Sequence, residues 1–156
     1  MPESSNPEDG PSGAAHVPGS AAWLGGAGLL PFVAGAATLW MFPAWAAIAE
    51  SALVVYGAVI LSFMGGCRWG LAAAGMGQGV TWSGLVISVA PALWAWPAVL
   101  IGGAAAAVML ACGLLVLLWA DLVLTKENGA PAWWPTLRVP LSLGAAASLI
   151  VGAAAM

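Results

Sequence analysis

The sequence predicts an all-α integral membrane protein, folded as a compact up-down bundle of five transmembrane helices. Composition is the first reason: the 156 residues are 62% hydrophobic and 6% charged, with a mean hydropathy of +0.99, whereas about a quarter of the residues in a soluble domain are charged. Segment length is the second, because five apolar stretches approach the ~20 residues that a helix needs to cross a bilayer. The sequence shows no sheet pattern, and an open sheet would leave backbone groups unpaired in lipid.

Short connections separate the five predicted spans. The spans cover residues 21–42, 46–74, 81–101, 104–124 and 137–156. Three connections, MFPAW, AGMGQG and IGG, are marked by Gly or Pro, and TKENGAPAWWP is the one polar loop. Such short connections make successive helices antiparallel. Pro31 and Pro91 fall near the middle of the first and third spans, where the missing backbone donor predicts a kink in each helix.

The N-terminal segment has a different composition from the rest of the chain. Residues 1–20 are rich in Pro and acidic residues and contain no apolar run, so they are predicted to form a disordered polar tail in which His16 is solvated. No basic region precedes the first apolar stretch, which is also longer than the apolar core of a signal peptide. The first span is therefore expected to remain in the mature protein.

Tryptophan positions support these boundaries, because indole prefers the membrane interface. If the tail lies on one membrane face, side A, each of the ten tryptophans falls near a span end. Those near side A are Trp23, Trp69, Trp82, Trp119, Trp133 and Trp134, and those near side B, the opposite face, are Trp40, Trp45, Trp94 and Trp96.

The three basic residues indicate the orientation. Arg68, Lys126 and Arg138 all fall near side A in the five-span arrangement. The positive-inside rule then predicts a cytoplasmic N-terminus and an external C-terminus. Because an Arg-rich transit peptide is missing, the sequence favours the bacterial cytoplasmic (inner) membrane over the mitochondrial inner membrane.

The second span carries a ladder of small residues. Ala58, Ser62, Gly66, Gly70 and Ala74 recur at every fourth position and include the GxxxG pentapeptide GCRWG. Such a stripe lets another helix approach closely and predicts a helix-packing surface. Its partner is either another helix of this chain, a second copy or another membrane protein. A weaker ladder, Gly144, Ser148 and Gly152, follows the fifth span.

Arg68 is the most unusual residue of the second span. It lies two residues from both Gly66 and Gly70, about 200° round the helix, so its side chain points away from the small-residue stripe. Three interpretations remain open: snorkelling to lipid phosphate, a structural ion pair with Asp121, and a charge that lines a polar path. Asp121 lies at the same predicted depth as Arg68, and so does Arg138. These three residues form a candidate intramembrane polar cluster.

Other residues offer little chemistry. Glu50 lies on the same angular face as Arg68 but about 27 Å away along the helix, so it is expected to be an interfacial carboxylate. Cys67 and Cys112 are expected to be small packing residues rather than a disulfide or metal ligands. The spans contain no His, no closely spaced carboxylates and no GxSxG, so the sequence predicts no catalytic, metal-binding or cofactor-binding residues.

These observations favour an assembly role over transport. The sequence predicts a non-enzymatic packing, assembly or accessory module whose partners are the lipid bilayer and, through its small-residue stripes, a second copy or another membrane protein. Nucleic acid is excluded as a partner because no basic patch is present. The alternative is a small transporter or a proton or solute conduit that uses Arg68 and Asp121.

Several segments together resemble a known family. GLLPFVAGA, YGAVILSFMGGCRWG, SVAPALWAW, the lone Asp121 and PAWWPTLRVPLS resemble, in this order, an uncharacterised family of multi-pass membrane proteins, a domain of unknown function that includes transmembrane protein 69. The resemblance covers about residues 21–150 and implies a small helical protein of bacterial inner membranes or mitochondria, with no known activity. The matching positions are Pro31, Phe32, Tyr56, Gly57, Gly65, Gly66, Arg68, Trp69, Gly70, Pro91, Asp121, Pro131, Trp133, Leu137 and Arg138.

Overall fold

The computed structural model describes residues 16–76 and 80–156, and it confirms the predicted helical bundle. The helices are α1 (Gly19–Met41), α2 (Ala46–Ala73), α3 (Trp82–Ile101), α4 (Gly103–Lys126) and α5 (Trp134–Ala153), with a short 3-10 helix η1 (Pro43–Trp45) between α1 and α2. All five α-helices are long and apolar enough to cross a membrane.

Most predicted boundaries differ from the observed ones by one to three residues; α4, for example, ends at Lys126 rather than at residue 124, and α5 ends at Ala153 rather than at residue 156. Gly19 and Ser20, which the prediction assigned to the tail, form the first residues of α1, while residues 1–15 of the predicted tail lie outside the described residues. The fifth helix begins at Trp134 rather than at residue 137. It begins earlier because Pro135 occupies the first turn, where a helix has no use for the missing backbone donor.

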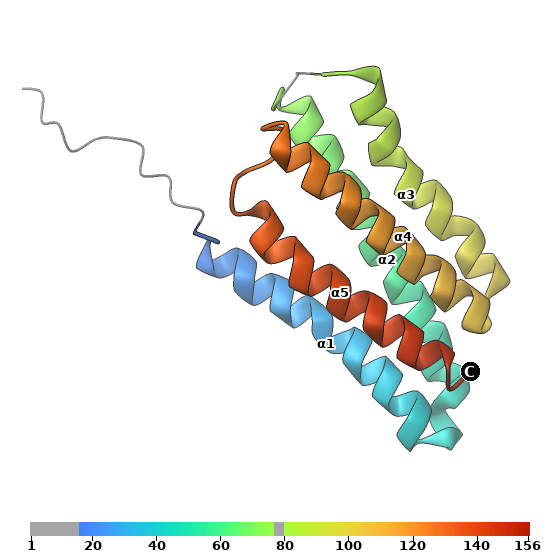
Figure 1. The fold of residues 1–156 in the computed structure, drawn as a ribbon. Coiled ribbons are helices and arrows are strands. Elements are labelled where there is room, and N and C mark those ends of the chain that lie inside the picture. Colours follow the sequence, from blue (N-terminus) through green and yellow to red (C-terminus); the bar gives the residue numbers. More distant parts are fainter. Residues whose placement is uncertain (1–15, 77–79) are drawn as a thin grey trace, which may run out of the picture.

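The helices pack around α2. Figure 1 shows α3, α4, α5 and α1 side by side, with α2 behind them, and α2 contacts each of the other four. Successive helices alternate in direction, so α1 and α5, which are also in contact, run parallel to each other. The α3–α4 turn reverses the chain through Gly102 and Gly103, whose φ angles of 68° and 61° lie in the left-handed region that favours glycine.

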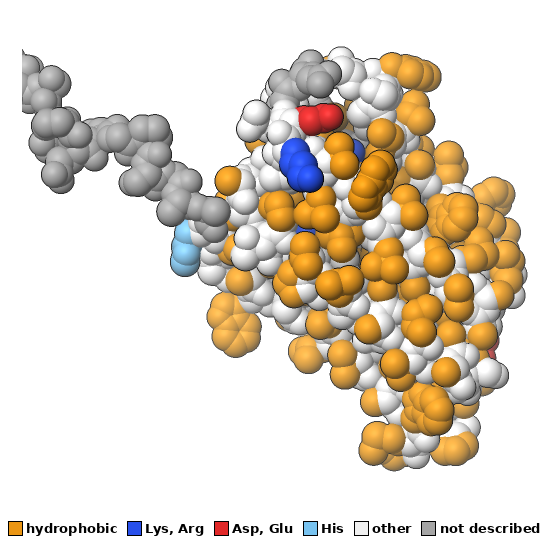
Figure 2. Space-filling model, in the orientation of Figure 1, with side chains coloured by type: hydrophobic (Ala, Val, Ile, Leu, Met, Phe, Trp, Pro, Cys, Tyr) orange, Lys and Arg blue, Asp and Glu red, His pale blue; other side chains and the backbone are white. Residues whose placement is uncertain are grey.

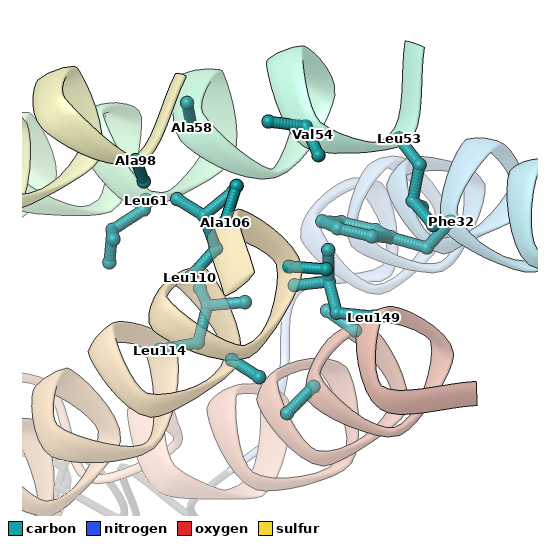
Figure 3. Close-up of a cluster of buried hydrophobic side chains, with 14 of the residues drawn as sticks. Phe32, Leu53, Val54, Ala58, Leu61, Ala98, Ala106, Leu110, Leu114 and Leu149 are labelled. Carbon is teal, nitrogen blue, oxygen red and sulfur yellow. The ribbon is translucent and has the colours of Figure 1, made fainter. Parts of the chain in front are cut away.

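The core consists of leucine, alanine and one phenylalanine. Figure 3 shows Leu110 and Leu114 of α4 at its centre, close to Leu61 of α2, while Leu149 of α5 lies near Phe32 of α1. All five side chains are at most 1% exposed. In a bilayer, such a core is held by close packing and dispersion, because lipid tails are as apolar as leucine.

The outer surface is also apolar. Large hydrophobic side chains are exposed on every helix. On the face drawn in Figure 2, they cover most of the surface, and the basic side chains gather toward the upper end, where α4 finishes. A hydrophobic band with basic side chains at one end is the surface expected of a protein embedded in lipid.

The mid-span prolines lie inside continuous helices. α1 continues through Pro31, and α3 through Pro91. Pro91 is buried where α3 approaches α2 most closely: a Cβ added to Gly65 would lie 2.5 Å from the Ser88 carbonyl oxygen and 3.3 Å from two carbons of the Pro91 ring. Pro91 therefore marks a helix contact that only glycine at position 65 permits.

Candidate functional site

The structure brings Arg68, Asp121 and Arg138 together in a buried ion triad. Nη1 of Arg68 donates to Oδ1 of Asp121, and Nε of Arg138 donates to Oδ2 of the same carboxylate, each at 2.8 Å. The three residues are 6%, 1% and 4% exposed. Each carboxylate oxygen therefore accepts one charge-assisted hydrogen bond, which is stronger than a hydrogen bond between neutral groups.

The ion triad connects three helices near side A. Arg68 comes from α2, Asp121 from α4 and Arg138 from α5, and Nη1 of Arg138 also contacts the sulfur of Met64 on α2. The guanidinium of Arg68 is paired inside the bundle rather than extended to the bilayer surface. Two guanidinium groups and one carboxylate leave the ion triad with one net positive charge.

Several buried donors next to the ion triad have no hydrogen-bond partner among the described residues. They are Nε of Arg68, Nη2 of Arg138, the indole Nε1 of Trp134 and the hydroxyl of Ser142. Unsatisfied buried polar groups are uncommon in folded proteins, and each calls for an explanation such as a bound molecule.

Two cavities flank the ion triad. The α1–α2–α5 cleft, with a volume of about 480 Å³, is lined mainly by apolar side chains and by Trp134, Arg138 and Ser142. A smaller pocket of about 130 Å³ lies between α2, α3 and α4, with Arg68, Ser88 and Glu127 in its walls. The ion triad thus separates an apolar cleft from a small polar pocket.

The predicted small-residue stripe of α2 divides into two parts. Ala58 is buried in the core and Ser62 is half-buried, whereas Gly66, Gly70 and Ala74 are exposed. A Cβ placed on Gly66 or Gly70 would meet nothing within 4 Å in the part of the chain that the structure describes. The exposed part of the stripe is therefore not used for packing between the described helices.

The weaker ladder of α5 packs inside the bundle. A Cβ on Gly144 would lie 2.9 Å from Leu29 of α1, and one on Gly152 would lie 2.5 Å from Leu53 of α2 and 3.3 Å from Leu39 of α1. This ladder therefore faces α1 and α2 and does not meet the exposed glycines of α2.

Of the remaining predicted positions, Cys67 lines the same cleft as Arg138, whereas Glu50 lies toward the opposite end of the bundle. Glu50 is half-buried near side B, and Oε1 of its carboxylate lies 3.8 Å from the point where a Cβ of Gly103 would be. Cys67 and Cys112 are free thiols on α2 and α4, and His16 is exposed. Within residues 16–76 and 80–156, no three His, Cys, Asp or Glu side chains come together as metal ligands.

Comparison with known proteins places the chain in a family. Residues 17–154 match the family described as "Protein of unknown function (DUF3429)". The chain belongs to this family. It is 38% identical over 137 residues to transmembrane protein 69 of Xenopus tropicalis, an alignment that covers 86% of this chain and 53% of the relative. It is 30% identical over 128 residues to transmembrane protein 69 of Mus musculus, with 80% and 51% covered.

The DUF3429 region makes up nearly the whole of this chain, but the chain spans about half the length of the curated relatives it matches. No solved structure matches the chain. The chain thus belongs to a family of transmembrane proteins whose function is unknown.

Sequence reasoning missed three features of this DUF3429 domain. Gly65, not its neighbour Gly66, makes the close contact with α3. Tyr56 donates a 2.8 Å hydrogen bond to the Gly28 carbonyl and packs edge-on against Phe32, with ring centroids 4.9 Å apart, which fastens α1 to α2. The polar face of α5 was also missed, although a signal was available, since Trp134, Arg138 and Ser142 follow one another at intervals of four.

Proposed function

We propose that this DUF3429 protein is a non-enzymatic assembly module of the inner membrane, which associates with a second copy of itself through α2. The observation that carries the proposal is the open surface over Gly66 and Gly70, where an added Cβ would meet no described atom within 4 Å. The other glycine ladder, on α5, packs inside the bundle, so of the two ladders only that of α2 has glycines open to an external helix.

This surface has the chemistry that helix association in lipid requires. Glycines four residues apart let the backbones of two helices approach, and dispersion and Cα–H···O contacts then accumulate. Phe63 and Trp69, both exposed on α2, offer side chains to pack at the edges of such a contact.

The ion triad supports a structural role over the alternative of a conduit. Both oxygens of Asp121 are engaged by arginines from other helices, so this carboxylate is held in place rather than free to carry a proton. Between the ion triad and side B, the buried cluster consists of Leu61, Leu110, Leu149 and similar apolar side chains. A polar route across the membrane would have to pass through this cluster.

The distribution of charge supports the proposed orientation. Arg68, Arg138 and Lys126, in the last turn of α4, lie at the same end of the bundle. By the positive-inside rule, this end and the N-terminus face the cytoplasm of a bacterium and the C-terminus lies outside. Reporter fusions at each terminus test this orientation, and an external N-terminus would contradict it.

A double substitution on α2 tests the assembly. We expect Gly66→Leu with Gly70→Leu to leave the thermal stability of the monomer unchanged, because space is available for both side chains, and to abolish dimers measured by light scattering and by single-molecule photobleaching in liposomes. The matched control is Gly26→Leu on α1, another exposed glycine with nothing described within 4 Å of an added Cβ. A monomeric wild-type protein, or a double variant that still dimerises, would refute the proposal.

A further inference from the structure

One wall of the α1–α2–α5 cleft carries polar donor groups that have no acceptor among the described residues. Of the described residues that line it, Trp134, Arg138 and Ser142 have a buried donor that lacks a partner: Nε1, Nη2 and Oγ respectively. Arg138 is 4% exposed and Ser142 is 2% exposed, so both side chains are withdrawn from bulk solvent and from the surrounding lipid. Leaving such groups unpaired is costly, and a ligand with acceptor oxygens would remove the cost.

The three donors lie on one stripe of α5. Because they are spaced by four residues, they follow one another on the same helix face, over about 12 Å along the axis. A guanidinium and an indole N–H can only donate, and a serine hydroxyl can also donate. The wall therefore recognises an acceptor.

The charge of the site favours an anion over a neutral acceptor. Arg138 is the charged residue among those that line the cleft, and the ion triad to which it belongs keeps one net positive charge. Asp121 occupies only Nε of this guanidinium, so Nη2 is left to bind a second anionic group. A carboxylate has two oxygens for such charge-assisted hydrogen bonds.

The rest of the cleft suits an aliphatic chain. Its walls include Gly25 and Gly28 of α1, Phe32 and Ile60, and its rim includes Leu24, which is exposed to lipid. Gly28 leaves room along α1, because an added Cβ would meet only the Tyr56 hydroxyl, at 3.7 Å, whereas Leu141 fills the space beside Gly25. The volume of the cleft, about 480 Å³, lies within the ~300–1,000 Å³ typical of small-molecule sites.

We infer that the α1–α2–α5 cleft binds a long-chain fatty acid, with its carboxylate against Arg138 and Ser142 and its tail along Gly28 and Phe32. The glycines of the proposed assembly surface, Gly66 and Gly70, do not line the cleft, whereas Phe63 borders both. The fatty acid enters sideways from the membrane, so its head lies one to two turns below the start of α5.

Binding of palmitate to the purified full chain in a non-ionic detergent tests the inference. Native mass spectrometry and thermal melting are expected to detect one bound palmitate, with hexadecanol, which has the same tail but no charge, at least about tenfold weaker. Ser142→Ala should weaken palmitate about tenfold, as loss of a hydrogen bond to a charged group does. Gly28→Leu, which fills the cleft at its α1 wall, should abolish binding.

Ser148→Ala is the matched control for Ser142→Ala. Ser148 is also on α5, but its hydroxyl donates to the Gly144 carbonyl at 2.9 Å and does not line the cleft, so palmitate binding should be unchanged. Equal binding of palmitate and hexadecanol, or equal effects of the two serine substitutions, would overturn the inference. Ser142-dependent binding of phosphatidylglycerol without binding of palmitate would also overturn it, in favour of a phospholipid phosphate.

Discussion

The two ends of the bundle are held together by different forces. Toward side B, the helices meet through leucine and alanine, such as Leu53, Ala106 and Leu149, with side chains that are almost completely buried. Toward side A, Asp121 binds Arg68 and Arg138, and a cleft and a pocket flank the ion triad. The side-B end is closely packed and apolar, whereas the side-A end contains buried charges and two cavities. In a bilayer, close packing and dispersion stabilise the apolar side-B end. At the side-A end, buried charges are stable only when they are paired with each other.

The largest effect is expected where an ion is left unpaired. Asp121→Ala would leave two buried guanidinium groups without their carboxylate, which costs about 3–5 kcal/mol when one partner of a buried pair is removed. We expect the protein to disappear from the membrane fraction, or its free energy of unfolding to fall by that amount in a detergent titration. A variant that accumulates and melts like wild type would show that the ion triad does not hold the side-A end together.

Replacing the whole ion triad is the control for that variant. Arg68→Leu, Asp121→Leu and Arg138→Met together leave no buried charge, and such apolar replacements are often neutral or stabilising. We expect the triple variant to recover the stability lost in Asp121→Ala. If it is as unstable as the single variant, the cost arises from lost shape rather than from unpaired charge.

The next largest loss of stability is expected in the apolar core toward side B. Leu110→Ala would open a cavity among Leu61, Leu149 and Gly57, and large-to-small core changes cost about 2–5 kcal/mol. Because lipid gives no hydrophobic gain between helices, we expect the lower end of this range, about 2 kcal/mol, in reversible unfolding. The control is Leu115→Ala on the same helix, at a lipid-exposed position, where little change is expected. Equal losses at both sites would contradict the dispersion argument.

A loss of similar size is expected at the tight contact between Gly65 of α2 and Ser88 of α3. Gly65→Ala would place a methyl group 2.5 Å from the Ser88 carbonyl oxygen, so the two helices must move apart, at the cost of about 1–3 kcal/mol typical of overpacking. Gly66→Ala, one residue later and on the outer surface of the bundle, is the matched control when both variants are compared as monomers. Thermal melting of the two variants should differ, and equal melting temperatures would place the contact elsewhere.

The sequence could predict much of this comparison, but not all of it. The number of helices follows from five apolar runs of spanning length, whereas equal depth in the membrane made the pairing of Arg68 with Asp121 only one of three interpretations. Depth alone does not give the rotation of α2, because apolar side chains cover all its sides when both lipid and protein are apolar. For this reason the sequence could not distinguish Gly65, which contacts α3, from Gly66, which faces outward.

The smallest predicted effect is a gain, and it returns to the hollow end of the molecule. Ser142 has a buried hydroxyl without a described partner, and removing an unsatisfied buried group relieves a cost of about 1 kcal/mol. Ser142→Ala should therefore raise the melting temperature of the lipid-free protein by a few degrees, and Ser148→Ala, which loses a made hydrogen bond, should not. If Ser142→Ala raises the melting temperature and also weakens palmitate binding, the Ser142 hydroxyl lowers stability and serves binding. Destabilisation by Ser142→Ala would instead show that the hydroxyl is satisfied within the bundle, and the polar wall of the cleft would then consist of Arg138 and Trp134.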